Sequence, residues 1–360
     1  MSSKVYFHSL EQRVENDLTP LDLGEGLRRL AANLKITGAA GGPWGMKVQL
    51  GPAGLPASIM PAWAQAVAGQ LPGGAFCFDT LSITTRGLEE PASHLEIAGK
   101  KGFGGDGTAI PFRVADAPDQ GPSESRELPG GEGHSAYGLA GGLRAAAGLA
   151  VLTPLRPHPH LGFAGALATA GLGLADRATK IRLHRDIRPK VDTPLCAGCG
   201  SCLDVCLFDA IVFEAGRAAI DHTRCTGCGE CMNVCFMAGI SDAEGAGIPN
   251  FQRGVAAAAA AGISAFAGVG RPGPVFFNFL LRLGRQAAGP QNRKTVRVGD
   301  IGVLASRDPV ALDRAAWDLV CDRQGGDLSL WSGFKQEPGI LLAEAERLGL
   351  GSSSHDLIEV

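Results

Sequence analysis

The sequence reads Cys196-Ala-Gly-Cys199-Gly-Ser-Cys202-Leu-Asp-Val-Cys206 and then, 29 residues after its first cysteine, Cys225-Thr-Gly-Cys228-Gly-Glu-Cys231-Met-Asn-Val-Cys235. Both copies have the spacing C-x2-C-x2-C-x3-C, and together they hold eight of the ten cysteines in a chain of 360 residues. The residues between the cysteines are mostly small, so the backbone can close tightly round a group that the thiolates bind. The stretch therefore predicts a small metal-binding module within a larger chain.

In two-cluster bacterial ferredoxins this spacing holds 4Fe-4S clusters, and the fourth cysteine of each run ligates the cluster of the other run. We therefore expect two sets of ligands. The first set is Cys196, Cys199, Cys202 and Cys235, and the second set is Cys225, Cys228, Cys231 and Cys206. Two 4Fe-4S clusters would make one-electron transfer the chemistry of this module.

Structural zinc and a disulfide framework are the alternative uses of clustered cysteines. Zinc ribbons carry C-x2-C pairs separated by a long gap, and disulfide frameworks are typical of small secreted chains. Neither pattern fits two closely spaced runs of four. One feature departs from the usual ferredoxin run, because Leu207 and Phe236 follow the fourth cysteines, where proline is common. Both residues are apolar, so we expect them to shield the clusters from water.

The composition indicates a globular protein. Apolar residues make up 45% of the chain and charged residues 19%, which argues against disorder. A net charge of −3 gives no support for nucleic-acid binding, and no stretch is apolar enough for a membrane span. The N-terminus lacks the pattern of a signal peptide, and clustered thiolates suit a reducing compartment, so we expect a cytoplasmic location. The remaining Cys77 and Cys321 lie in apolar segments, as buried packing residues do.

Outside the cysteine runs, short apolar stretches alternate with helical patterns. The expected strands are Val5–Phe7, Met46–Leu50, Ala75–Phe78, Leu149–Thr153, Val275–Leu280 and Ile301–Leu304. The expected helices are Leu23–Leu34, Ala57–Ala68, Ala92–Lys100, Phe163–Leu174, Pro309–Val320 and Ile340–Leu348. This alternation predicts an α/β host domain with a largely parallel sheet. A small α+β ferredoxin-like domain at 191–247, with a hairpin turning at Gly216, is expected to interrupt a host domain made of 1–190 and 248–360.

Charge is unevenly distributed around the module. Residues 176–190 carry six basic side chains against two acidic ones, whereas residues 196–247 carry seven acidic side chains against only Arg217 and Arg224. The basic segment could pack against the acidic one, or both could be solvated faces. The sequence leaves these two alternatives open.

These motifs resemble an uncharacterised iron–sulfur family, the domain of unknown function 362, in a form with an inserted two-cluster bacterial-type ferredoxin module. The resemblance covers nearly the whole chain. It is carried chiefly by Asp300-Ile-Gly-Val-Leu-Ala-Ser-Arg-Asp-Pro-Val-Ala-Leu-Asp313, together with Phe78-Asp79-Thr80, Gly162–Leu167 and Gly349–Gly351. It implies a two-cluster module in an α/β host, without an agreed biochemical activity.

Several polar positions of that family pattern are altered in this chain. A histidine, an arginine and a lysine–asparagine pair are replaced by Gln49, Met60, Ala168 and Thr169. A Cys-Asp-Cys stretch expected after Leu281 is missing from residues 282–291. If these groups form a site in relatives, the resemblance implies a less polar site here.

Polar groups that follow predicted strands are the candidates for a host-domain site. Asp79 and Thr80 follow one strand, where open α/β sheets place ligand-binding groups, and Lys47 is a possible anion contact from its own strand. His94 could reach the same crevice, which makes Asp79 and His94 the candidates for catalytic residues. The alternative is that Asp79 caps a turn and His94 satisfies a helix end.

Three further patterns favour structural roles. Gly102-x-Gly104-x2-Gly107 has the form of a dinucleotide fingerprint, but it follows a helical pattern, which favours a loop at a helix C-terminus. His158 and His160 could bind a metal, but no nearby cysteine or carboxylate completes a site, so surface or cluster-shielding roles fit better. Asp308 is predicted to cap a helix, and Asp313 to occupy an exposed helix position.

The sequence thus predicts an iron–sulfur protein that passes single electrons through two 4Fe-4S clusters, as the redox component of an oxidoreductase. The alternative is a ferredoxin-type carrier or adaptor whose host domain only docks protein partners. An enzyme should bind a small-molecule substrate in the host crevice, whereas a carrier should bind only a redox protein partner. The sequence identifies neither the substrate nor the partner.

Overall fold

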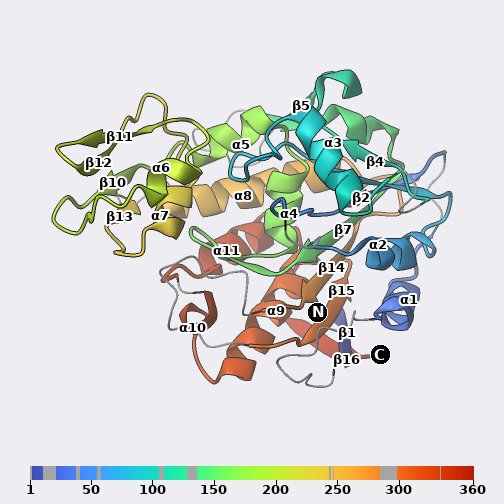
Figure 1. Cartoon of the computed structure of the whole chain (residues 1–360). Coiled ribbons are helices and arrows are strands. Elements are labelled where there is room, and N and C mark those ends of the chain that lie inside the picture. Colours follow the sequence, from blue (N-terminus) through green and yellow to red (C-terminus); the bar gives the residue numbers. More distant parts are fainter. Residues whose placement is uncertain are drawn as a thin grey trace.

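One eight-stranded sheet runs through the body of the protein in the computed structural model (Figure 1). The structure describes residues 2–10, 22–37, 41–54, 58–104, 109–127, 136–242, 245, 247–283, 298–332 and 334–360. The strands follow the spatial order β16 (His355–Glu359), β1 (Ser3–Ser9), β15 (Gly302–Ser306), β14 (Val275–Leu280), β7 (Gly148–Pro154), β2 (Trp44–Lys47), β3 (Ala75–Asp79) and β4 (Phe112–Val114). Segments from both sides of the cysteine runs therefore share one sheet.

The expectation of a largely parallel sheet is confirmed. Strands β14, β7, β2, β3 and β4 are parallel to their neighbours in that order, and β1 is parallel to β16. Only β15 runs antiparallel to both of its neighbours, β1 and β14. Strands β2, β7, β14 and β15 are buried along their whole length, as expected for strands that helices cover on each side.

Helices cover both faces of the sheet, and two separate apolar clusters fill the layers between. One layer holds α1 (Gly24–Asn33), α2 (Pro61–Ala68) and α3 (Pro91–Lys100). The other holds α4 (Ala166–Gly173), α8 (Gly247–Ser264), α9 (Pro309–Gln324) and α11 (Gly339–Arg347). Strand β14 contributes to both, because Phe276 joins the α4 layer and Phe277 the α1 layer. Smaller elements are α5 (Arg177–His184), α10 (Ser329–Ser332), β5 (Glu124–Arg126), β6 (Tyr137–Leu139), β8 (Arg156–His158), β9 (Gly162–Ala164) and the 3-10 turns Pro118–Gln120 and Gly141–Ala145.

The cysteine runs form a lobe beside this body, and α8 leads from the lobe back into the body (Figure 1). The lobe contains β10 (Pro189–Val191), α6 (Ser201–Val205), β11 (Ile211–Glu214), β12 (Arg217–Ile220), α7 (Glu230–Val234) and β13 (Ile240–Asp242). Strands β10 and β13 pair with each other, so the lobe begins and ends at one place. The predicted hairpin is confirmed, with Ala215 and Gly216 at its turn in positive-φ conformations of 47° and 76°.

Most predicted elements are present, with shifts at their ends. Strand β14 has the predicted bounds, and α9 begins at Pro309 with Asp308 as its N-cap, accepting the Val310 and Ala311 N–H groups at 2.9 Å. Helix α4 begins at Ala166, three residues later than predicted. Helix α8 was not among the predicted helices, although it packs closely against α4 and α11.

The prediction that Asp313 is exposed is wrong, because its carboxylate is buried between three elements. Oδ1 accepts the Ala166 N–H at 2.7 Å and an Asn278 side-chain N–H at 2.8 Å, and Oδ2 accepts the Leu167 N–H at 2.9 Å. Helix α4 begins after Gly165, which has no side chain to act as a cap, so Asp313 of α9 satisfies its first N–H groups instead. Burial raises the pKa of Asp313 to about 6, although the N–H donors favour the ionised form.

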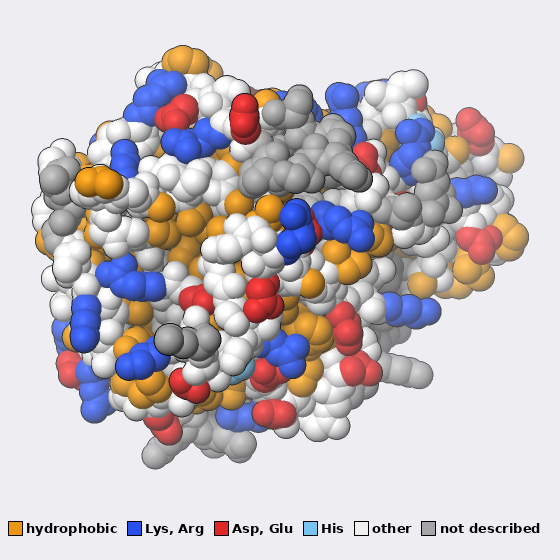
Figure 2. Space-filling model, turned by 180° about the vertical axis from the view of Figure 1, so that it is seen from behind, with side chains coloured by type: hydrophobic (Ala, Val, Ile, Leu, Met, Phe, Trp, Pro, Cys, Tyr) orange, Lys and Arg blue, Asp and Glu red, His pale blue; other side chains and the backbone are white. Residues whose placement is uncertain are grey.

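The outer surface carries charges of both signs. On the face seen in Figure 2, lysine and arginine side chains are interspersed with aspartate and glutamate, and apolar groups lie between them. None of the helices in the described part of the chain combines the length and apolar character needed to cross a bilayer.

Replacing Asp313 by alanine should destabilise the fold by about 3 kcal/mol, because two helix N–H groups and the Asn278 amide would lose their acceptor in a buried place. Urea denaturation measures the change. Asp318→Ala on the same helix is the matched control, since Asp318 is half-exposed and its ion pair with Arg314 should contribute less than about 1 kcal/mol. Equal losses in the two variants would contradict the bridging role of Asp313.

Candidate functional site

Two cavities in the described part of the lobe are each lined by four cysteines. The first cavity is lined by Cys196, Cys199, Cys202 and Cys235, and the second by Cys206, Cys225, Cys228 and Cys231. Each cavity thus gathers three cysteines from one run and the fourth cysteine of the other run. This is the grouping that the sequence predicts for two cluster ligand sets, although ligation itself stays a prediction.

The two cavities differ in their surroundings. The first opens toward solvent, because Cys199 is exposed and Phe236 at its rim has 47% of its surface accessible. The second lies against the body of the protein, because Gly229 in its lining abuts His160, and Pro189 and Phe208 also line it. Phe236 thus lies where a shielding residue was expected, whereas Phe208 lines the second cavity in place of the expected Leu207.

Backbone geometry around the cysteines fits an inserted cluster. Backbone N–H groups donate to the sulfurs of Cys196, Cys206 and Cys225 at 3.5, 3.3 and 3.4 Å. Gly227 and Gly229 have φ values of 76° and 83°, and a β-carbon at Gly227 would meet the Ile187 carbonyl oxygen at 2.5 Å. Only glycine therefore allows this loop to pass so close to the body.

The thiols are not arranged for a single ion. Among the described residues, no group of three or more Cys, His, Asp or Glu side chains converges on one point. Thiolates that bind a four-iron cluster instead lie around the outside of a larger body, which agrees with four cysteines lining a cavity. Burial raises the pKa of Cys228 to about 11, so a bound cationic group would have to displace its proton.

A larger crevice, of about 380 Å³, lies at the carboxyl ends of β2, β3 and β7. Parallel strands end at the same edge of a sheet, which is where open α/β sheets bind ligands. Lys47, Asp79 and Thr80 line this crevice, as predicted from their places after the strands. Gln49, Ala168 and Thr169 also line it, whereas Met60 does not.

Asp79 is held from two sides. The Lys47 ammonium donates to Asp79 Oδ1 at 2.8 Å, and His94 Nε2 lies 3.6 Å from Oδ2. Burial would raise the pKa of Asp79, but Lys47 and His94 together lower it below its usual value, so the carboxylate is ionised. His94 is fully buried behind Asp79 and does not line the crevice; its Nδ1 faces the Leu88 carbonyl at 3.1 Å.

Lys180 of α5 is the crevice residue that sequence reasoning missed. Its ammonium donates to Thr80 Oγ1 at 2.7 Å and to the Leu81 carbonyl at 2.6 Å. Burial lowers its pKa to about 8, while nearby carboxylates, Asp116 first, oppose the shift. The sequence offers one signal, since Lys180 and His184 are four residues apart on one helix face that lines the crevice.

Three histidines pack round Phe251 of α8, between the crevice and the second cavity. The rings of His158, His160 and His184 lie 6.1, 5.6 and 4.3 Å from the Phe251 ring, centroid to centroid. His160 is fully buried and abuts Gly229, so the expected surface position is wrong for it, and it lies where a cluster-shielding residue would.

The crevice and the second cavity meet at α7. Glu230 lines both spaces, and Asn233, one turn further on, lines the crevice. Cys231 lies beside Glu230 in the chain and lines the second cavity. A molecule in the crevice would therefore lie next to the second group of cysteines.

Other predicted features lie elsewhere or remain open. Gly102 and Gly104 follow the C-terminal end of α3, as a helix-terminal loop requires, whereas Gly107 lies outside the described residues. The basic segment contacts the lobe through Arg177, whose guanidinium lies 5.4 Å from the centre of the Phe208 ring. Cys77 is buried as predicted, whereas Cys321 is only partly buried.

Comparisons with known proteins identify one family. The family described as "Domain of unknown function (DUF362)" matches residues 45–318. No curated protein matches the chain. Among solved structures, the lactate racemase apoprotein from Thermoanaerobacterium thermosaccharolyticum superimposes with a TM-score of 0.37 and 11% identity, covering 86% of this chain. The chain spans about half, 55%, of the length of that structure.

Acid should weaken the packing round Phe251. Burial is the main cause that lowers the pKa of His158 to about 3 and of His184 to about 4. The folded state therefore resists protonation, while the unfolded state binds protons below about 6.5. Stability should therefore fall as the pH drops from about 6.5 toward 4, by roughly 2 kcal/mol for His184 at pH 5. Urea titrations at pH 7 and pH 5 measure this difference.

The variant His184→Leu should lose that share of the pH dependence. The matched control is His222→Leu, because His222 is exposed on the lobe. If both variants keep the pH dependence of the original chain, the histidines round Phe251 do not cause it.

Proposed function

The chain belongs to the DUF362 family. We propose that it is an iron–sulfur protein that transfers single electrons through two 4Fe-4S clusters. The supporting observation is the exchange of fourth cysteines between the two cavities. If each run of four cysteines bound its own metal group, its fourth cysteine would not need to line the cavity of the other run. When bound, the clusters would supply reversible one-electron storage.

In this proposed function, the cysteines, the backbone N–H groups, the glycines and the shielding side chains have separate roles. The cysteines of the two sets hold the clusters, and the backbone N–H groups that donate to their sulfurs help to set the potentials. Gly227 and Gly229 bring the second set close to the body. His160 and Phe208 keep water from that set.

The two cavities face different surroundings, which supports different roles. The second adjoins the crevice, whereas the first adjoins the solvent-exposed surface of the lobe. Six of the ten exposed large apolar side chains among the described residues belong to the lobe: Leu195, Leu203, Val212, Phe213, Phe236 and Met237. We propose that a redox protein partner exchanges electrons at the first cavity, and that the crevice side serves a reaction in the body.

The alternative function is a carrier or adaptor whose body only docks partners. The apolar rim of the first cavity favours it, because that rim needs only a protein partner. The crevice distinguishes the two functions, since a carrier has no use for a polar cavity next to its second cluster. Localisation in the cytoplasm remains part of this proposal, because 4Fe-4S clusters suit a reducing compartment.

Replacing Cys206 by serine should perturb the cluster held by Cys225, Cys228 and Cys231, because Cys206 lines their cavity. Anaerobic purification with iron analysis, followed by electron paramagnetic resonance of the reduced protein, measures the effect. We expect about eight irons per chain originally and loss of one cluster signal in the variant. Cys321→Ser is the control, and it should leave iron content unchanged. Damage confined to the first cluster would refute the assignment, and absence of iron would refute the proposed function.

Both potentials should lie in the low half of the ferredoxin range of about −700 to +450 mV. All eight ligands are thiolates, and acidic residues outnumber Arg217 and Arg224 over 196–247, so adding an electron is disfavoured. A dye-mediated titration under argon measures the midpoints. Two midpoints above the standard hydrogen potential would contradict this expectation.

A further inference from the structure

One buried cation of the crevice, Lys180, has carboxylates nearby, Asp116 first, but forms no ion pair among the described residues. Lys47 has Asp79 as its counter-ion, but Lys180 forms no ion pair with any described residue, although only 7% of its surface is accessible. Its partners are a hydroxyl and a carbonyl oxygen. A lysine so deeply buried is rarely left without an anionic partner. Its pKa of about 8 keeps it mostly protonated at pH 7.

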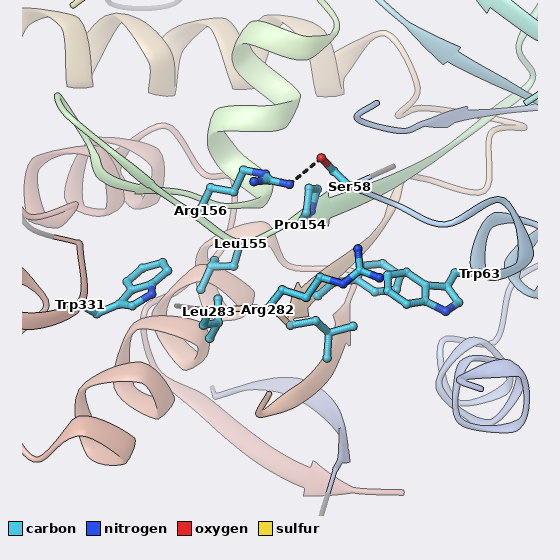
Figure 3. Close-up of a pocket in the computed structure, with 10 residues that line it drawn as sticks. Ser58, Trp63, Pro154, Leu155, Arg156, Arg282, Leu283 and Trp331 are labelled. Carbon is cyan, nitrogen blue, oxygen red and sulfur yellow. Dashed lines mark hydrogen bonds between the residues drawn. The ribbon is translucent and has the colours of Figure 1, made fainter. Parts of the chain in front are cut away.

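Arg156 adds a second cation to the crevice wall. It donates to Ser58 Oγ at 2.5 Å, and Figure 3 shows this contact across a small cavity that Arg282 also lines. Burial and, to a smaller extent, the neighbouring Arg282 lower the pKa of Arg156. The pKa of Lys101 is lowered mainly by burial and also by the charge of Arg156. Arg156 lines the crevice, whereas Arg282 and Lys101 do not, and no described carboxylate forms an ion pair with Arg156.

An unsatisfied hydroxyl lies in the same space. Thr169 Oγ1 is buried and has no hydrogen-bond partner among the described residues, although Thr169 lines the crevice. Thr169 and Lys47 both lie beside Gly173. A β-carbon added at Gly173 would be 2.5 Å from Lys47 Cε and 3.5 Å from Thr169 Cγ2. Buried polar groups normally have a partner, so this hydroxyl indicates that a ligand atom belongs beside it.

We infer that the crevice binds a small organic oxyanion, with its carboxylate or phosphate group held by Lys180, a polar atom beside Thr169, and Arg156 adding positive charge elsewhere on the crevice wall. The crevice has the size of a small-molecule site. Glu230 lies at the α7 end and repels an anionic group, so the charged end of the ligand faces α5 and its other end faces the second cavity. That orientation rests on the proposed function, since it places the reacting part of the molecule next to an electron carrier.

Calorimetric titration of the full-length chain with succinate and, separately, with inorganic phosphate tests the inference. Sodium chloride holds the ionic strength constant and excludes nonspecific screening. We expect saturable binding of at least one anion, and the comparison shows whether the site prefers carboxylate or phosphate. Lys180→Gln should weaken binding roughly tenfold or more, because a charge-assisted hydrogen bond is lost.

Two further variants keep the test decisive if Lys180→Gln does not fold. Thr169→Val conserves shape and removes only an unpartnered hydroxyl, so it should fold normally and weaken binding several-fold. Arg156→Gln should weaken binding less than Lys180→Gln does, because it removes only longer-range attraction. The exposed Lys100→Gln, which also removes one positive charge, should bind like the original chain. Absence of binding to both anions, or equal binding in all variants, would overturn the inference.

Iron content, measured on the same samples, separates this inference from the proposed function. Anion binding to a protein without iron would support the crevice assignment while removing the electron-transfer function. Two clusters without anion binding would leave the carrier function in place and refute the anion site. Each result decides one question independently of the other.

Discussion

The pairing of β14 with β7 is the interaction on which the rest of the molecule depends. Val275 to Phe279 run parallel to Ala150 to Pro154, and these two strands come from opposite sides of the cysteine lobe. Asp313 reinforces the junction, because a carboxylate after the lobe satisfies the N-terminus of a helix before it. Both contacts must form together, so the lobe can project from the body only where the chain leaves and rejoins this junction.

The placement of the polar groups follows from that arrangement. Because β2, β3 and β7 are parallel, their last residues lie at one edge, and α5 and α7 close the space beyond it. Lys47 and Asp79 thereby form a buried ion pair beneath the crevice. Glu230 belongs to the lobe and lines both the crevice and the second cavity, so this one residue lies between the two spaces.

Local signals in the sequence were sufficient for much of this structure. The continuous apolar run Val275–Leu280 predicted β14 with its observed bounds, and Asp308 before Pro309 predicted the start of α9. The start of α4 was predicted too early because its cap, Asp313, is distant in the chain. Helix α8 escaped prediction since its Ala-rich sequence is apolar on nearly every side.

The candidate site was predictable only in part, for a similar reason. Strand position was enough to place Lys47, Asp79 and Thr80 together, because parallel strands end at one edge. His94 was placed in the crevice, but helix packing turns it behind Asp79. Lys180 went unrecognised because it is buried without an ion pair, which its spacing from His184 in the sequence does not reveal.

The pairing of β10 with β13 has a consequence for the history of such chains. Pro189 lies opposite Asp242 and Val191 opposite Ile240, so the lobe enters and leaves through two adjacent strands. A segment attached in this way resembles a cassette, which a short turn could replace without changing the register of the main sheet. The electron-carrying capacity that we propose for the lobe could thus be gained, lost or exchanged between chains by insertion at a single point, without rebuilding the crevice.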